Sequence, residues 1–565
     1  MGNVSTFGTY ALARLGIYAA QSAVTITGNN ISNINTRGYT RQAIDQFSLN
    51  MGGADRYQSM MSTRIGSGAF VAGVTQLRDP YLDIRYRNEM SHLGHYEGWM
   101  EGLNQVAGVL DEVGRGDDEA GILEARFNEL IQQMQNLNTM GAGKDEFDTL
   151  VRSACTSIVN TFHSYANQLQ TQFQNADKRF RQDLKEVNSI LERIRDLNSS
   201  IRKTQVYGGN ALELMDERNN LLDELSEYVD IDITYEQDKV GEGLYVDRLV
   251  VTLAGDSKTE LINGVYAAEF SIRQVEDDEG NMVDSPNYDL NLSALKDKYD
   301  RVMKVNGVIS KEVELGDTDL YGLLQAEREI LTEEGEYTSD DAIANDPSAA
   351  FKRGIPYYQK ALNTLANTFA NVLNKANIEA AGGDTDFALF SNDGNTNNTG
   401  DPPIDAFNIS ISYKWSIHEA RMIESKMYAN GEVGSLDDIP STANDNLQYI
   451  LALLTNDVSY YKTMYEDYTD IGYEDDEELT FTGTFQEFLT THMAGTLAND
   501  MNTYQTMMDN HEINIDNLFI DRDAVMGVDL NDEAMNLMQY QKAYQASCRL
   551  MTVYDTMLDK LINGT

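Results

Sequence analysis

The sequence predicts a mainly α-helical, elongated protein of several domains, with a β-rich domain inserted between helical segments. Three observations support this. Apolar residues recur at helical spacing over long stretches, short strand-like runs lie in the middle of the chain, and only 7 prolines occur in 565 residues. Because one hydrophobic core stops growing at about 250 to 300 residues, a chain of this length should divide into about two to four domains.

A helix is predicted near the N-terminus. Its apolar stripe consists of Phe7, Ala11, Leu15, Tyr18, Ser22 and Ile26. The helix should end within residues 28–42, GNNISNINTRGYTRQ, because Asn and Gly readily adopt the left-handed backbone that terminates helices. Asparagine amides in this run can also bridge neighbouring backbone segments.

The first half of the chain continues with helices predicted over residues 81–110 and 122–137. The clearest pattern covers residues 158–201, where apolar side chains three and four positions apart indicate one long amphipathic helix. Another helix is predicted over residues 212–228, after the turn at Gly208 and Gly209. The last two helices should pack as an antiparallel hairpin, since their connection is short and each has one apolar face.

Strand-like patterns begin after residue 230. Strands are predicted over residues 248–253 and 266–272, with a hairpin loop at 277–281, and a further strand is predicted over 407–413. A polar run, 391–403, precedes this last strand. It resembles a calcium loop superficially, but counting from Asp393 it lacks the glycine and glutamate that an EF-hand requires, so a surface loop is favoured.

Helical patterns return at residues 357–380, 446–454 and 484–508, so the helical bundle should be assembled from both halves of the chain. From Leu530 a C-terminal helix carries two adjacent seams. One contains Ala534, Leu537, Gln541, Tyr544, Cys548, Met551, Asp555, Leu558 and Ile562, and the other contains Tyr540, Tyr544, Ser547, Met551, Tyr554, Leu558 and Leu561. This face is too wide for a two-stranded coil, so we expect the N-terminal helix and neighbouring subunits to cover it.

Three domains are therefore predicted. They are a terminal coiled-coil domain of residues 1–45 and 525–565, a helical bundle of residues 46–230, 350–380 and 445–524, and a β-rich outer domain of residues 231–349 and 381–444.

The charge of the chain narrows the classes of partner. A formal net charge of −47 arises from 90 acidic and 43 basic residues, which disfavours nucleic acid and anionic membranes as partners. The N-terminus lacks the pattern of a cleavable signal peptide, and no stretch of 18 or more apolar residues predicts a membrane span. Any export should therefore use another route.

No pattern of catalytic residues stands out. His92 and His95 lie near Glu97 and Glu101, yet no cysteine or third histidine falls within metal-ligand spacing, so histidines on a solvated helix are favoured. Cys155 and His163 would lie about 12 Å apart on one helix, too far for a nucleophile and its base. Cys548, in the C-terminal seam, should act as a small apolar residue. We expect no enzyme activity, no cofactor and no metal.

The two ends of the chain carry recognisable motifs. Residues 28–42 contain Asn-Asn-Ile, a later Asn, and Thr-Arg-Gly-Tyr, and residues 540–549 read YQKAYQASCR. Together they resemble the two signatures of the flagellar axial proteins, a family of rod, hook and hook-associated proteins. Arg37 occupies the position where that family usually has proline. Segments 211–226, 320–324 and 365–370, and Asn446 before Leu447, resemble the hook-associated members in particular.

The resemblance implies a structural subunit of the bacterial flagellum, located outside the cell where hook and filament join and required for filament assembly. It implies unfolded export through the flagellar type III apparatus without a cleavable signal, and a dedicated cytoplasmic chaperone that covers the C-terminal helix. The implied partners are further copies in a ring, the hook protein and a second hook–filament junction protein, with no nucleic acid and no membrane insertion. The alternatives are another axial protein of hook or rod type, or a secreted coiled-coil adhesin or effector.

Self-assembly residues follow from the same motifs and seams. The N-terminal set is Ala11, Leu15, Tyr18, Ile26, Asn29, Asn30, Ile31, Asn33, Asn35, Gly38 and Tyr39. The C-terminal set, which should also bind the chaperone, is Leu530, Leu537, Gln541, Tyr544, Gln545, Ala546, Ser547, Met551 and Leu558.

Overall fold

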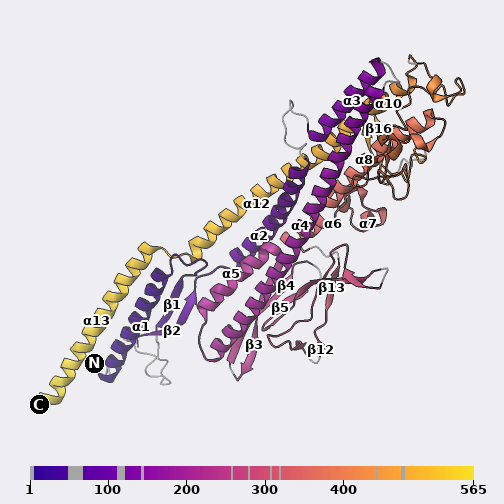
Figure 1. Cartoon of the computed structure of the whole chain (residues 1–565). Helices are drawn as coiled ribbons and strands as arrows, with labels where there is room; N and C mark the ends of the chain where they lie inside the picture. Colours follow the sequence, from indigo (N-terminus) through magenta and orange to yellow (C-terminus); the bar gives the residue numbers. More distant parts are fainter. Residues whose placement is uncertain are drawn as a thin grey trace.

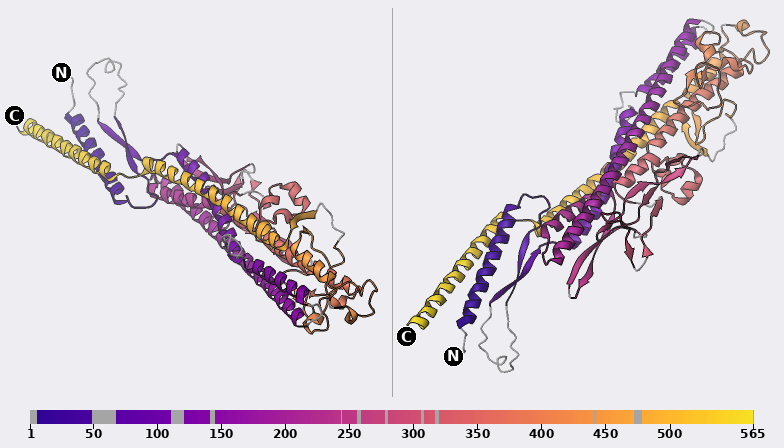
Figure 2. Two further views of the ribbon diagram at one scale, coloured as in Figure 1. Left: turned by 90° about the horizontal axis from the view of Figure 1, so that it is seen from above. Right: turned by 60° about the horizontal axis from the view of Figure 1, so that its bottom comes forward.

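The computed structural model describes an elongated molecule in which long helices run along the main axis and small sheets lie at one side (Figure 1). The described residues are 6–48, 68–110, 121–140, 145–242, 244–255, 259–277, 280–305, 308–316, 320–440, 442–471 and 478–564. Both ends of the chain lie together at one end of the molecule, beyond the helical bundle (Figure 2).

The bundle contains helices from both halves of the chain, as predicted. They are α2 (Pro80–Val109), α3 (Ile122–Met140), α4 (Asp145–Val206), α5 (Leu212–Tyr228), α6 (Leu323–Thr332), α8 (Ile355–Ala380), α10 (Asp445–Thr455) and α12 (Thr496–Met526). The longest, α4, has 62 residues, and most of its predicted apolar stripe, including Phe162, Phe180 and Leu191, is fully buried. The predicted hairpin of α4 and α5 is confirmed, with Gly208 and Ala211 at positive φ in the turn.

A row of glycines on α2 lets other helices approach its backbone. A Cβ on Gly98 would lie 2.7 Å from the Cβ of Ala326, and one on Gly102 would lie 2.5 Å from Ile330 Cδ1, both on α6. Residues 320–349 were predicted in the β-rich domain. That placement is wrong for α6, because its buried side chains pack against Gly98 and Gly102 of α2.

Two small sheets lie beside α4. The first has the order β3 (Ile231–Gly241), β4 (Leu244–Leu253), β5 (Glu260–Asn263), β6 (Tyr266–Ala267), and the second has the order β13 (Val313–Gly316), β10 (Leu290–Leu292), β7 (Phe270–Ile272). Two short hairpins accompany them, β8 (Gln274–Glu276) with β9 (Met282–Asp284) and β11 (Lys304–Val305) with β12 (Val308–Ile309). The strand predicted over 266–272 is therefore two strands, because the chain passes from one sheet to the other within it.

The second part of the predicted β-rich domain, residues 381–444, lies at the end of the bundle opposite the chain termini, whereas the two sheets lie beside its middle (Figure 1). Its strands, among the described residues, form one two-stranded pairing of β14 (Phe390–Ser391) and β15 (Ser410–Ile411), so the strand predicted over 407–413 is mostly irregular. Amides of α8 hold this irregular chain: Asn374 accepts from the backbone N–H groups of Leu389 and Phe390 at 2.8 Å. The Asp393 loop is a surface turn, as predicted.

The helix predicted over 484–508 extends much further. It begins as α11 (Phe485–Glu487), passes through a π-helical segment (Phe488–Gly495) and continues as α12 to Met526. Between Leu497 and Ile515 this helix has no fully buried residue, so the apolar pattern that marks a helix fades there although the helix itself continues.

The chain ends form a separate group. It consists of α1 (Thr6–Ser32), the antiparallel hairpin of β1 (Gln42–Ser48) and β2 (Ala69–Gln76), and α13 (Leu530–Asn563). The hairpin packs on α1, although residues from 46 onward were predicted in the bundle. The division into three domains otherwise stays a prediction. No helix among the described residues combines the length and apolarity that crossing a bilayer requires.

Candidate functional site

The terminal helices α1 and α13 lie side by side and run in opposite directions (Figure 1). Small side chains allow a close approach: a Cβ on Gly16 would lie 2.9 Å from the hydroxyl oxygen of Ser547. The buried face of α1 is built mainly of alanines, Ala13, Ala19, Ala20 and Ala23, with Ile26. This pairing holds the two chain ends together within one molecule.

The predicted stripe on α1 is wrong in two of its members. Ala11 is exposed and Tyr18 is 57% exposed, while Leu15 is half-buried and only Ile26 is fully buried. The large side chains of α1 indicated one face, whereas the packed face consists of alanines covered by α13 and by the hairpin. Phe7 lies in a part of α1 whose side chains are outside the described set.

On α13 the second predicted seam is the inner one. Its half-buried members are Tyr540, Ser547, Met551, Tyr554 and Leu558, and two residues of the first seam alone, Leu537 and Cys548, are half-buried beside them. The members of the first seam that differ from these are exposed, namely Ala534, Gln541, Asp555 and Ile562, as are Leu530, Tyr544, Gln545 and Ala546. The helix therefore shows most of its surface to solvent.

The motif that ends α1 is organised around Asn30. Its amide nitrogen donates to the carbonyl of Gln42 at 2.9 Å, and its amide oxygen accepts from the Gln42 N–H at 3.0 Å and from the Tyr39 hydroxyl at 2.9 Å. Asn30 is 1% exposed. Burial, reinforced by nearby carboxylates, raises the pKa of Tyr39 to about 12, so its hydroxyl stays a donor. The prediction that asparagine amides bridge backbone segments here is confirmed at Asn30.

The other motif residues shape the loop. Asn33 donates its amide to the Asn29 carbonyl at 3.0 Å and accepts from the Thr36 hydroxyl at 3.3 Å. Gly38 has φ of +73°, and a Cβ there would lie 1.8 Å from the amide oxygen of Asn220. Only glycine fits this position. The remaining predicted residues are less enclosed: Ile31 is half-buried, and Asn29 and Asn35 are exposed.

Three connections meet between the terminal group and the bundle, and we call this region the joint. Residues 33–41 lead from α1 back to β1 within the terminal group, whereas residues 77–79 and 527–529 cross to the bundle. The Arg41 N–H donates to the Met526 carbonyl at 2.8 Å, and the Arg41 guanidinium pairs with Glu533 of α13 at 2.7 Å. The Thr40 N–H donates to the buried Asp216 carboxylate of α5 at 3.1 Å. The first connection is thus bonded to both α5 and α13.

Buried charges stabilise the bundle side of the joint. Arg522 of α12 pairs with Asp83 of α2 at 3.0 Å and with Asp223 of α5 at 2.8 Å, and Arg87 also pairs with Asp223 at 2.7 Å. Burial alone would raise the pKa of Asp223, but Arg87 and Arg522 lower it below its ordinary value. The cluster therefore keeps its charges and links three helices.

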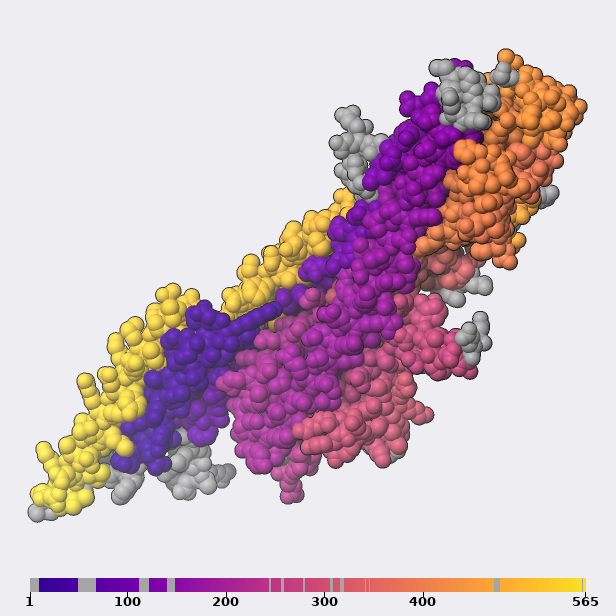
Figure 3. All heavy atoms as spheres, in the orientation of Figure 1, coloured from indigo at the N-terminus to yellow at the C-terminus, as the bar shows by residue number. Residues whose placement is uncertain are grey.

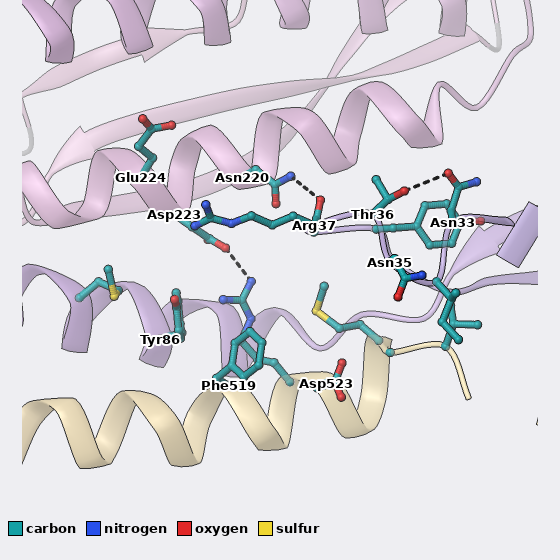
Figure 4. A pocket seen from close by; sticks show the side chains of 18 of the residues that line it. Asn33, Asn35, Thr36, Arg37, Tyr86, Asn220, Asp223, Glu224, Phe519 and Asp523 are labelled. Carbon is teal, nitrogen blue, oxygen red and sulfur yellow. Dashed lines mark hydrogen bonds and ion pairs between the residues drawn. The ribbon is translucent and has the colours of Figure 1, made fainter. Parts of the chain in front are cut away.

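A pocket of about 780 Å³ opens beside this cluster (Figure 4). Arg37, Tyr86, Asn220, Glu224 and Phe519 are among the residues that line it, and Asn220 donates to the Arg37 carbonyl at 3.3 Å. Its lining contains no histidine or cysteine. The pocket offers no nucleophile with an adjacent base, so its features are those of a packing joint.

The other candidates for chemistry are structural. His92 stacks on His511 at a centroid distance of 5.1 Å, and the nearest His95 and Glu329 side-chain atoms are 3.9 Å apart. The two histidines therefore pack between helices, and the prediction of a solvated face is wrong. Cys155 is fully buried, and burial raises the pKa of its thiol. Within the described segments, no three His, Cys, Asp or Glu side chains are placed to hold a metal ion.

Comparisons with known proteins relate both parts of the chain to flagellar components. The family model described as flagellar hook-associated protein FlgK helical domain matches residues 110–390, and the one described as flagellar basal body rod FlgEFG protein C-terminal matches residues 524–564. The flagellar hook-associated protein 1 of Bacillus subtilis (strain 168) is 25% identical over 571 residues, which cover 99% of this chain and 98% of that protein.

Two further matches are more distant. The flagellar hook-associated protein 1 of Salmonella typhimurium (strain LT2) is 24% identical over 226 residues, covering 39% of this chain and 38% of that protein. The solved structure of the flagellar hook junction protein FlgK from Burkholderia pseudomallei aligns with a TM-score of 0.37 at 15% identity, covering 53% of this chain and 45% of that one.

Proposed function

Since this chain belongs to the flagellar hook-associated protein 1 family and is therefore a structural protein of the bacterial flagellum, we propose that it forms the junction between hook and filament and is required for filament assembly. It self-assembles into a ring through its terminal helices, which form a coiled coil with those of neighbouring copies. The match to the hook-associated helical domain over residues 110–390 favours this role over that of a hook or rod protein.

The exposed surface of α13 carries this proposal. Met535, Met538, Val553, Met557 and Ile562 are between 46% and 70% exposed. The two terminal helices together contain four basic and four acidic residues, so their net charge is zero in a chain whose net charge is −47. Their place along one edge of the molecule is visible in Figure 3. A surface with exposed apolar side chains and no net charge on a strongly acidic molecule is typical of a protein interface.

The energies of burial and of association are consistent with assembly into a ring. Full burial of an exposed apolar side chain contributes about 1.5 to 3 kcal/mol, so burial of the exposed part of these five contributes on the order of 4 to 9 kcal/mol. Association of two proteins costs about 4 to 15 kcal/mol in lost freedom. One contact would therefore be weak, but a subunit in a ring has two neighbours, and the second contact is added without a further large entropic cost.

The proposed partners follow from this location. They are the hook protein on one side, a second hook–filament junction protein on the other, and the type III export apparatus during secretion. A dedicated cytoplasmic chaperone covers the exposed face of α13 before export, since an apolar helix of this kind would otherwise associate prematurely. The same residues, from Leu530 to Leu558, then serve two partners in succession.

Substitutions on the inner and outer sides of α13 test the role. Leu537→Asp and Tyr544→Asp in the full chain should reduce self-association, measured by sedimentation velocity, by at least tenfold, while the thermal transition of the bundle changes little. Leu150→Asp is the matched control, because Leu150 is a 48% exposed leucine on α4, distant from the terminal helices. Unchanged association in both α13 variants would contradict the proposal. Loss of filaments in cells that carry the same variants would support the proposed role in filament assembly.

A further inference from the structure

The outward face of α12 carries a regular row of acidic and apolar side chains. Asp509, Ile513, Asp516, Ile520 and Asp523 follow one another at alternating steps of four and three residues, which places them on one face of the helix. All five are exposed, Ile513 by 60% and Ile520 by 64%. The buried residues of these turns, Ile515, Leu518 and Arg522, lie on the opposite face, toward the bundle. We call the five residues the acidic row.

The outward face of α13 carries a row of the same spacing and opposite charge. Met535, Gln539, Lys542, Ala546, Arg549 and Val553 also follow alternating steps of four and three. Lys542 and Arg549 are the only charged residues between Ala534 and Tyr554. Both are exposed, and across the described part of the chain neither pairs with a carboxylate. We call these six residues the basic row. It faces away from α1, which packs on the other side of α13.

The two rows cannot meet within one molecule. Helix α12 ends at Met526 and α13 begins at Leu530, and α13 leads away from the bundle instead of folding back along α12 (Figure 1). Both helices lie along the same edge of the molecule (Figure 3). A contact between the rows therefore requires a second chain.

We propose that the basic row of one copy docks on the acidic row of a neighbouring copy. This inference rests on the proposed self-association through the terminal helices and names the surface that receives α13. Residues seven positions apart lie about 10.5 Å apart along a helix, so Lys542 and Arg549 match the spacing of Asp509 to Asp516 or of Asp516 to Asp523. In the first of these registers, with the two helices parallel, Ala546 lies opposite Ile513 and Val553 lies opposite Ile520.

The charges and the apolar side chains have different roles in this contact. Exposed ion pairs each contribute only about 0 to 1 kcal/mol, so affinity comes mainly from the apolar residues. The charges fix the register, because the spacing of Lys542 and Arg549 matches that of the carboxylates in the acidic row. A contact between two different faces of identical chains is heterologous, which generates rings or helical rows.

Charge reversal on the full chain tests the contact. One variant carries Lys542→Glu and Arg549→Glu, and another carries Asp509→Lys, Asp516→Lys and Asp523→Lys. Each alone should self-associate at least tenfold more weakly than the wild type in sedimentation velocity. An equimolar mixture should recover wild-type association, because each variant then finds its complement on the other. Lys178→Glu with Lys185→Glu is the matched control, since these exposed lysines of α4 are also seven residues apart.

The outcomes separate this inference from the proposed function. If Leu537→Asp abolishes association but the charge-reversed variants associate like the wild type, the terminal helices assemble without docking on α12, and the inference fails alone. If both variants are weak and the mixture does not recover, the rows do not contact each other, and the inference fails. A wild type that stays monomeric at every concentration overturns both.

Discussion

The side chain of Asn30 forms two hydrogen bonds with the backbone of Gln42, donating to its carbonyl at 2.9 Å and accepting from its N–H at 3.0 Å. The amide thus acts as a short piece of strand that closes the loop between α1 and β1. Because both residues are buried, water cannot replace these bonds.

Replacement of Asn30 by alanine should loosen the joint. Each unpaired buried polar group costs about 1 to 3 kcal/mol, so Asn30→Ala should increase amide hydrogen exchange at Tyr39–Gln42 while the thermal transition of the bundle is nearly preserved. Asn29→Ala is the control, because that neighbouring asparagine is exposed. Equal exchange in the two variants would show that the amide of Asn30 does not hold the loop.

A methyl group at Gly38 should be poorly tolerated. Gly38→Ala combines a positive φ with a clash against Asn220, so it should lower the stability of the joint by about 1 to 3 kcal/mol. Gly28→Ala should act in the opposite direction and stabilise by up to about 1 kcal/mol, because Gly28 is helical and a Cβ there meets nothing within 4 Å. Thermal unfolding and limited proteolysis at the loop would compare the two variants. Equal stability of Gly38→Ala and Gly28→Ala would contradict the expected clash with Asn220.

The stability of the bundle should depend on pH through Glu327. Burial, with the neighbouring Asp183 carboxylate, raises the pKa of Glu327 to about 9 from 4.5. Between these values the folded state keeps a proton that the unfolded state loses, so this group lowers the free energy of unfolding as pH rises toward 9 and has no further effect above it. Below pH 4.5 both states are protonated and the penalty disappears.

Glu327→Gln should remove this pH dependence and raise the melting temperature at pH 8, as denaturation series over pH would show. Glu129→Gln on the surface of α3 serves as the control and should leave the dependence intact. If Glu327→Gln lowers stability at pH 8, the carboxyl group is ionised and compensated in the folded protein.

Removal of Arg522 should be strongly destabilising. Arg522→Met leaves Asp83 with one cation partner fewer and Asp223 with Arg87 alone, and loss of one member of a buried ion pair costs about 3 to 5 kcal/mol. Arg126→Met breaks an exposed pair with Glu129 and should change stability by less than about 1 kcal/mol. Urea unfolding of both variants measures the contrast, and similar losses would contradict it.

Long periodic helices were the predictable part of the fold. Helices α4 and α5 bury one apolar face each and α8 is buried on most sides, so the spacing of their large side chains gives their position. The packed face of α1 was missed because it is built of alanines, which mark no side of a helix in the sequence. The contact of α6 with α2 depends on glycines whose role appears only when a second helix lies against them.

The sequence predicted which residues belong to the candidate site better than it predicted their contacts. The motif pointed to residues 28–42, and Asn30 and Gly38 have the roles that their amide and backbone freedom suggest. The partners of this loop in the bundle, Asp216 for the Thr40 N–H and Asn220 for the Arg37 carbonyl, lie about 180 residues further along the chain, and no local pattern connects them to it. The outer rows of α12 and α13 escaped notice because an Asp–Ile alternation does not resemble a buried seam.

The connections of the joint have a mechanical consequence. A single linker between the terminal helices and the bundle would act as a swivel, and torque applied to one part would be lost as rotation about it. Here two connections cross, and the loop of residues 33–41 bonds to both of them, through Arg41 to Leu77, Met526 and Glu533, and to α5 through Thr40, so the crossings cannot turn independently. The joint is therefore a torsionally stiff coupling, so a twist of the terminal helices turns the whole subunit.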